Sequence, residues 1–449
     1  MVPASSRRES PLRFLHTDDL HLDSAFVGLS TEAPPAVAEL LREATIRSWR
    51  EIVRIAVEEP VDFVVVAGDV FEQANRTLRG QIVFRDGLDA MAQAGIPSFV
   101  VTGNHDPLSG WEPSVRWPEL AHRFDSHHVT SMPITRDGEE IARVYGISYR
   151  VRDVTTNLAA RFRRDPDTPF AVGLLHANVG GIEGVPNYAP CTLGDLRAAD
   201  MDYWALGHIH RHRVLLSDRP TAVYCGNPQG RDPGETEPRG CYVVSVDAAG
   251  GIHPEFRVAD TVRWQLIRVP IEGLATEDDL VEAIARAADD ARVAADRSVV
   301  VRLALTGRGP LHRSLRRPGL LDQARDVARE RLGESVPFAW IESLRDETAA
   351  EVDLASRRLA DDFLGGLLRR FDATQAALAS ADPPPASPPT EPAGTSPMEP
   401  DQLSAMLDSL YTHERARRYL RDARPDRERL GQFVAEAESI LADRLAGEG

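Results

Sequence analysis

The sequence predicts an α/β protein, because short apolar runs of strand length alternate with longer segments that have helical spacing. Each run is bounded by charged or turn residues, as is typical of a strand buried in a sheet. Ligands collect outside the carboxyl ends of strands in open α/β sheets. Five of the runs end in side chains that bind metal ions, which predicts one functional site, and these runs are residues 12–15, 63–67, 99–102, 172–175 and 203–206.

Two helices are expected between the first three strands. Pro34 and Pro35 open a long helix whose apolar residues recur at helical spacing, and Pro60 ends it. Thr77 is a suitable N-cap for a second helix, which Gly95 ends. This alternation predicts parallel strands joined by right-handed crossovers. Later strands are expected to form a second sheet that completes a domain over residues 11–260, and they lie at 144–147, 223–225 and 242–246.

The pattern changes after Trp264, where a small α/β domain over residues 261–380 is predicted. Its expected strands are residues 265–269, 299–305 and 338–341, and its expected helices are 276–295, 320–332 and 346–379.

The rest of the chain is predicted to be a linker and a helical tail. Residues 381–400 are dense in Pro, Ser and Thr, a composition that gives an extended linker and cannot fill a core. Residues 401–449 have apolar residues at helical spacing from Leu403 and again from Leu430. They predict two amphipathic helices, which Pro425 separates.

Composition limits the class of function. A formal net charge of -17 argues against a protein that coats nucleic acid by bulk electrostatics, although a local groove remains compatible. The chain has no Lys, so it cannot contain the phosphate-binding loop of ATPases, and any ATP dependence must come from a partner. Three cysteines without C-x-x-C spacing give neither a disulfide framework nor a zinc knuckle. No apolar stretch is long enough to cross a bilayer, and we expect a cytoplasmic protein.

The strand ends provide carboxylate, imidazole and amide ligands. Taken singly, each has a structural alternative: Asp69 is suited to an Asx turn, His176 to a core and His208 with His210 to an exposed loop. Their joint occurrence at successive strand ends favours a two-metal site over these alternatives. The candidate ligands are Asp19, His21, Asp69, Asn104, His176, His208 and His210.

The order Asp-x-His, Gly-Asp, Gly-Asn-His-Asp, His and Gly-His-x-His resembles the calcineurin-like metallophosphoesterase superfamily. Within it, Phe-Leu-His-Thr at 14–17, Gly-Asp-Val-Phe-Glu at 68–72 and Gly-Asn-Pro-Gln-Gly-Arg at 226–231 are similar to SbcD-like and YhaO-like DNA repair exonucleases. The resemblance covers about residues 11–245. It implies a four-layer α/β/β/α sandwich, with a small α/β capping domain and a helical C-terminal tail.

The resemblance also implies how the site works. Asp69 would bridge two divalent ions, the usual metal being manganese, and such a pair activates water and clamps the reacting oxygens. His105 would face the scissile phosphate, and Asp106 would orient the His105 imidazole, so both are candidate catalytic residues. One ion would be held by Asp19, His21, Asp69 and His210, and the other by Asp69, Asn104, His176 and His208.

Two features depart from the family pattern. Asp18 replaces a small residue and adds a carboxylate beside a ligand. Arg231-Asp232-Pro233 replaces a histidine-containing run that follows the Gly-Asn-Pro-Gln-Gly segment in some relatives. Neither departure changes a predicted ligand.

The implied activity is hydrolysis of DNA phosphodiester bonds in repair, mainly as an exonuclease, with endonuclease activity as a compatible addition. The tail is expected to dock an SMC-like ATPase, with packing on its own body as the alternative, and a homodimer is compatible. An acid-free window between Asp296 and Asp322 predicts DNA backbone contacts beside the metal site, with a solvated loop as the equal alternative. The candidate contacts are Arg302, Arg308, Arg313, Arg316 and Arg317.

Two other functions fit the same ligands. One is a phosphodiesterase or phosphatase that acts on a small nucleotide or a phosphoprotein. The other is a scaffold for the ATPase that has no catalytic activity of its own. The second domain, the arginine window and the tail favour DNA as substrate, because a small substrate requires none of them.

Overall fold

The computed structural model describes most of the chain in two compact units. Unit 1 contains Met1–Leu266, Ala288–Arg302 and Leu332–Glu342, and unit 2 contains Ile267–Ala287, Leu303–Arg331 and Ser343–Gly449. The described residues are 11–446 without 25, 27–32, 73–76, 110–114, 183, 334–335, 351–353, 380–401, 403–404 and 406–426. The expected linker at 381–400 and nearly all of the first tail helix therefore lie outside the described residues.

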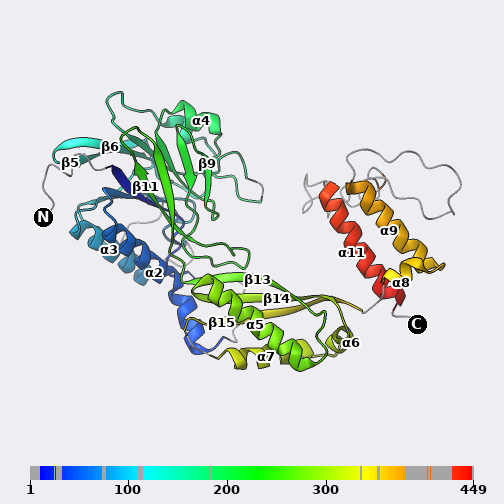
Figure 1. Cartoon of the computed structure of the whole chain (residues 1–449). Coiled ribbons are helices and arrows are strands. Elements are labelled where there is room, and N and C mark those ends of the chain that lie inside the picture. The colour runs from blue at the N-terminus through cyan, green and yellow to red at the C-terminus, as the bar shows by residue number, and fades with distance from the viewer. Residues whose placement is uncertain are drawn as a thin grey trace. The chain divides into compact units, whose positions relative to one another are not determined.

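Unit 1 contains two six-stranded sheets (Figure 1). In the first sheet, β1, β2, β3 and β4 run parallel, and β11 pairs antiparallel with β1. The segment at 242–246, which we expected in the second sheet, therefore belongs to the first, since its backbone pairs with the free edge of β1. The strand order is β12 (Ile252–Val258), β11 (Gly240–Val246), β1 (Leu12–Thr17), β2 (Phe63–Ala67), β3 (Ser98–Val101) and β4 (Ala121–Arg123).

The second sheet has parallel pairs at its centre and antiparallel pairs at its edges. Strands β6, β7, β8 and β10 are parallel, with β5 and β9 antiparallel outside them. The order is β5 (Thr130–Arg136), β6 (Glu139–Gly146), β7 (Ala171–His176), β8 (Tyr203–Gly207), β10 (Thr221–Tyr224) and β9 (Arg213–Leu216).

The two sheets pack face to face, and helices cover their outer faces. On β7, Val172 and Leu174 enter a core shared with the first sheet, whereas Ala171 and Leu175 face the opposite way. This alternation is the period of a strand buried on both faces. On the first sheet lie α2 (Pro35–Glu58) and α3 (Leu78–Gln93), and on the second lie α4 (Leu193–Ala198) and the 3-10 turn η2 (Ala159–Arg161). The expected four layers are present.

The helix ends follow from local chemistry. Pro35 begins α2, a position where a backbone N–H would have no acceptor within the helix, so the missing N–H of proline costs no hydrogen bond. The Thr77 hydroxyl accepts from the amide of Gly80 at 2.9 Å and caps α3, as predicted.

A small three-stranded sheet with its own helices follows the sandwich in the chain. Strands β13 (Val262–Pro270), β14 (Ser298–Arg308) and β15 (Ala339–Ala349) form a three-stranded sheet, with α5 (Glu277–Ala295), α6 (Leu311–Leu315) and α7 (Leu320–Leu332) between them. The predicted helix at 346–379 is wrong at its start, because β15 extends to Ala349. The alternating side chains of 342–348 fit an extended strand with one solvated face, and sequence spacing alone did not distinguish it from a helix. Helices α8 (Leu354–Leu359) and α9 (Phe363–Ala379) follow.

The tail helix α11 (Arg427–Ala446) packs beside α9 (Figure 1). Phe371 and Leu378 of α9 meet Leu430 and Val434 of α11 in a small apolar cluster. The alternative that the tail packs on its own chain is therefore realised for this helix. None of the helices described in the structure is both long and apolar enough to span a membrane.

Candidate metal centre

The two sheets meet at the carboxyl ends of their central strands. At the end of β8, a Cβ on Gly207 would lie only 2.1 Å from the carbonyl oxygen of Ala67, the last residue of β2. Only glycine permits this approach. It brings the loops after β1, β2 and β3 within reach of those after β7 and β8, which belong to the other sheet.

The first group of candidate ligands comes from β1 and β8. Nε2 of His21 lies 3.3 Å from Nε2 of His210, and both lie with a carboxylate oxygen of Asp19 inside 4.8 Å. The Asp19 carboxylate also accepts from the amide of His208, at 3.2 Å. These three side chains are the ligands predicted for one ion, apart from the shared Asp69.

The second group surrounds His176. Its Nε2 lies 3.0 Å from the Asn104 side-chain oxygen and 3.3 Å from a carboxylate oxygen of Asp69. The ring of His208 lies 5.1 Å from that of His176, and its Nε2 faces the Pro186 carbonyl at 2.7 Å. Nδ1 is therefore the nitrogen of His208 left for a metal.

Asp19 and Asp69 connect the two groups. Oxygens of both carboxylates lie with a His176 nitrogen inside the same 4.8 Å limit. The structure thus brings all seven predicted ligands to one place, with Asp69 beside Asp19 and His176.

The ligand atoms face one another in a way that suits cations. Nδ1 of His176 lies 2.9 Å from the Ala67 carbonyl oxygen, which can only accept, so Nδ1 carries a proton, and in this tautomer Nε2 is the acceptor. That acceptor faces the acceptor oxygens of Asp69 and Asn104. His21 and His210 repeat the arrangement, since Nδ1 of each faces a glutamate. The donor set therefore fits two divalent ions.

Electrostatics leads to the same conclusion. Asp18, Asp19 and Asp69 are each at most 1% exposed. Burial, followed by repulsion from Asp18 and Asp69, raises the pKa of Asp19 well above its ordinary value. Burial lowers the pKa of His21 to about 3, so this imidazole is neutral, as a metal ligand must be. Asp18 adds a third buried carboxylate to the cluster, where ionised groups require compensating positive charge.

Four candidate ligands have left-handed backbone. The φ angles are 45° at Asp19, 41° at His21, 49° at Asp69 and 101° at His208. Non-glycine residues pay about 1–3 kcal/mol for sparsely populated conformations, which cluster at functional sites. These bends turn the side chains from the strand ends toward the centre.

His105 is positioned by Glu72, for which no role was predicted from the sequence. Its Nδ1 contacts one Glu72 oxygen, while the other Glu72 oxygen lies 3.1 Å from Nδ1 of His21. Burial lowers the pKa of His105, but the hydrogen bond to Glu72 and the charge of Asp69 outweigh it and raise the value overall. The side chain is 28% exposed, so Nε2 is the ring nitrogen left for a substrate.

The expected role of Asp106 needs correction. We predicted that it orients His105, but its two oxygens accept from the amides of Gly103 at 2.7 Å and Val70 at 2.8 Å. Burial and the charge of Asp69 raise the pKa of Asp106 to about 6, against the effect of these amides. Asp106 therefore fixes the loops after β2 and β3, and Glu72 orients the imidazole.

Two further residues of the centre were missed. Glu235 accepts from Nδ1 of His210 at 2.6 Å and from the amide of Arg231 at 2.7 Å. The Arg231 side chain is 12% exposed and donates to the Ser24 hydroxyl at 2.9 Å. The only sequence signal was the Gly-Asn-Pro-Gln-Gly-Arg segment, which indicates a family but not a contact.

The arginine window is only partly available to a ligand. Arg302 pairs with Glu342 at 2.8 Å, Arg317 pairs with Glu277, and Arg308 donates to the Ala350 carbonyl at 2.8 Å. Arg313 and Arg316 are exposed, and neither has an ion pair with any residue that the structure describes.

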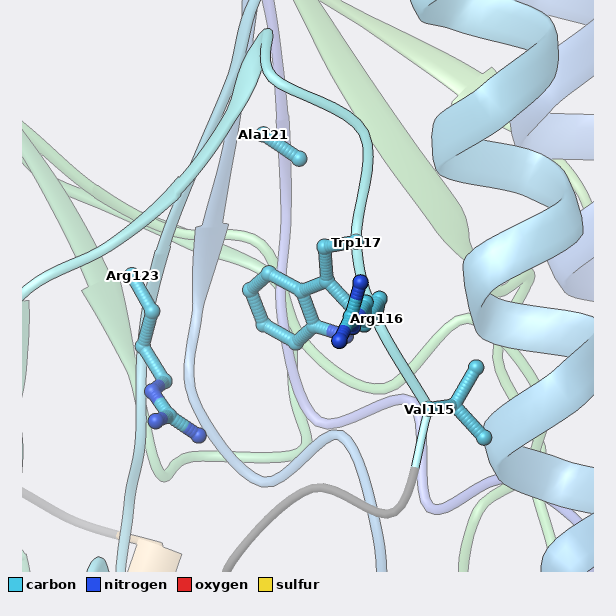
Figure 2. Close-up of a pocket in the computed structure, with 5 residues that line it drawn as sticks. All are labelled: Val115, Arg116, Trp117, Ala121 and Arg123. Atoms are coloured by element: carbon cyan, nitrogen blue, oxygen red, sulfur yellow. The ribbon is translucent and has the colours of Figure 1, made fainter.

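An open pocket of about 410 Å³ lies on the connection from β3 to β4, which also contains Asn104 and His105. Figure 2 shows the Trp117 indole projecting toward Arg123, whose guanidinium carbon lies 5.7 Å from the ring centroid. No acidic residue is among the five that line the pocket, which are Val115, Arg116, Trp117, Ala121 and Arg123. Its chemistry suits an aromatic or anionic group.

Comparison with known families agrees with this geometry. A model of the calcineurin-like phosphoesterase family matches residues 12–212, and a model of the middle domain of metallophosphoesterase YhaO matches residues 264–349.

Individual relatives extend this result. The chain is 24% identical over 303 residues to the DNA double-strand break repair protein Mre11 of Methanopyrus kandleri, covering 61% of this chain and 63% of that protein. It is 26% identical over 259 residues to the SbcD component of the nuclease SbcCD of Bacillus subtilis, covering 48% and 61%. It is 38% identical over 365 residues to the metallophosphoesterase YhaO of Bacillus subtilis, covering 80% of this chain and 87% of that protein. The chain therefore belongs to the YhaO family of calcineurin-like metallophosphoesterases.

Proposed function

We propose that this protein hydrolyses DNA phosphodiester bonds in repair, mainly as an exonuclease, with two Mn²⁺ ions as cofactors. The observation that carries the proposal is the convergence of buried acceptor atoms around Asp69. Of the predicted ligands, Asp19, His21 and His210 would hold one ion and Asn104, His176 and His208 the other, with Asp69 between them. When bound, the pair supplies a hydroxide near neutral pH and stabilises charge on the phosphate.

The side chains around the centre have separate tasks in this proposal. Glu72 holds Nδ1 of His105, which leaves Nε2 to contact the phosphate or the leaving oxygen. Glu235 and Glu72 fix the rotation and tautomer of His210 and His21. The Asp106 carboxylate accepts hydrogen bonds from the amides of Gly103 and Val70 and so fixes the loops that carry Asn104 and Asp69.

Two features support DNA over a small phosphodiester. Mre11 and the SbcD component of SbcCD, a repair protein and part of a nuclease by name, are distant relatives. The pocket with Trp117 and Arg123 offers a stacking surface and positive charge on the connection that carries His105 (Figure 2).

A substrate panel tests the proposed activity. With Mn²⁺, we expect cleavage of end-labelled duplex DNA and of a chromogenic phosphodiester, and His105→Ala should lower both rates by about 10²- to 10⁴-fold. Manganese binding by the variant, measured by calorimetry, should be retained, since His105 is not a ligand. Turnover of the small diester without any DNA cleavage favours the small-nucleotide alternative. No turnover of either, with metal bound, favours the scaffold.

Glu235, whose carboxylate accepts from Nδ1 of His210, provides a test of the metal centre. Glu235→Gln should weaken Mn²⁺ binding by about 10- to 100-fold, because the neutral amide no longer raises the basicity of the imidazole. Glu237→Gln is the matched control, since Glu237 pairs with the exposed Arg211. Equal manganese affinity in the two variants would contradict the assigned role of His210.

We also propose that Arg313, Arg316 and Arg317 contact the DNA backbone. Replacing the three with Glu should weaken DNA binding and flatten its salt dependence, because fewer counterions are released. Hydrolysis of the chromogenic diester should not change. Arg286→Glu, an exposed arginine on α5 that pairs with Glu282, is the control. Unchanged DNA affinity in the triple variant would remove these residues from the interface.

The tail is proposed to dock an SMC-like ATPase. Among the described residues of α11, Leu430 and Val434 face α9, whereas Phe433, Ile440 and Leu441 are 39%, 56% and 37% exposed. An apolar surface is thus left beyond the contact with α9. Deletion of residues 401–449 should abolish co-purification of the ATPase and spare hydrolysis of the small diester. Retained co-purification would count against this assignment.

A further inference from the structure

We infer that Arg231 binds a non-bridging oxygen of the substrate phosphate at the metal centre. The inference rests on the phosphoesterase part of the proposed function and applies to DNA and small diesters alike.

The backbone places Arg231 at the centre. It follows β10 in a turn closed by Glu235, whose carboxylate accepts from the amides of Arg231 at 2.7 Å and Asp232 at 3.1 Å. The other Glu235 oxygen accepts from Nδ1 of His210 at 2.6 Å. A single carboxylate therefore connects the arginine turn to a candidate metal ligand.

The side chain points to the ligand loops after β1 and β2. Nη1 of Arg231 donates to the Ser24 hydroxyl at 2.9 Å and lies 3.8 Å from a Glu72 oxygen. Glu72 is also the carboxylate that contacts His21 and His105. The guanidinium and the His105 imidazole therefore lie beside the two oxygens of the same carboxylate.

The charge of Arg231 acts on the ligands. Its Nη1 lies 3.8 Å from a Glu72 oxygen that in turn lies 3.1 Å from Nδ1 of His21, so the positive charge stands beside the ligand loops. Two bound cations would repel the guanidinium, and the negative charge of a bound phosphate would offset part of this repulsion in addition to the carboxylates already present.

The donors of Arg231 are incompletely used. Its Nε is buried and has no hydrogen-bond acceptor among the residues that the structure describes, a feature that it shares with Nε of Arg239. The separation of 3.8 Å from Glu72 is too long for a hydrogen bond, so the pair is not the bidentate arrangement that guanidinium and carboxylate prefer. The planar guanidinium is equally suited to the oxygens of a phosphate.

Arg239 shows what a structural arginine looks like at the same place. It is 5% exposed, and its Nη1 donates to the Asn227 side chain at 2.7 Å and to the His210 carbonyl. These contacts hold the turn in place. With the residues that the structure describes, the Arg231 side chain makes one hydrogen bond, to the Ser24 hydroxyl.

The test compares Arg231→Gln with Arg231→Lys and with Arg211→Gln. Arg211 adjoins His210 in sequence, but its side chain is 71% exposed and pairs with Glu237, so it controls for loss of one charge near the centre. Calorimetry on the Mn²⁺-loaded protein measures the affinity for inorganic phosphate, and a separate titration measures the affinity for Mn²⁺.

Arg231→Gln should weaken phosphate binding by about 10- to 100-fold, as expected for loss of a charged hydrogen bond. The same variant should bind Mn²⁺ as tightly as the wild type or more tightly, because a repelling charge has been removed. Arg231→Lys should lose less phosphate affinity than Arg231→Gln. Arg211→Gln should behave as the wild type in both titrations.

Two results would overturn the inference. One is unchanged phosphate affinity in Arg231→Gln. The other is a parallel loss of phosphate and Mn²⁺ affinity in both Arg231 variants, which identifies a structural role. If the wild type hydrolyses no phosphodiester, the proposed function fails, and the phosphate titration still decides the role of Arg231.

Discussion

The arrangement of the centre depends on buried acceptor atoms that face one another where two sheets meet. Nε2 of His21 faces Nε2 of His210, and Nε2 of His176 faces oxygens of Asp69 and Asn104. A cation between such atoms would be coordinated by both of them, so metal binding and the folded geometry of the loops are linked. The left-handed φ angles at Asp19, His21, Asp69 and His208 are compatible with loops that are held by this coordination.

Carboxylates outside the seven predicted ligands hold the ligand loops together. Glu72 joins the loop of His21 to that of His105, and Glu235 joins the loop of His210 to the turn of Arg231. Asp106 performs the same task through backbone amides. Each of these groups connects segments from different strands, so the position of a ligand depends on contacts that are distant in sequence.

Charge patterns in the sequence overestimated the free positive surface. Several arginines of the window between Asp296 and Asp322 are used inside the fold, since Arg297 pairs with Asp260 and Arg302 pairs with Glu342. A count of arginines cannot reveal such pairs, because their acidic partners lie about 40 residues away. In contrast, Arg231 is a single arginine within a turn, and only its surroundings indicate a role.

The sequence by itself determined the central strands of the two sheets and the kinds of side chain at their ends. The predicted strand at residues 63–67 coincides with β2 and the predicted helix at 320–332 with α7, because apolar periodicity and helix-end residues act locally. Local pattern could not assign residues 242–246 to their sheet, separate β15 from the helix after it, or find Glu72 and Glu235 beside the imidazoles. Those features depend on which strand edges pair and which loops meet, and only the packing of the two sheets through Gly207 and Ala67 decides that.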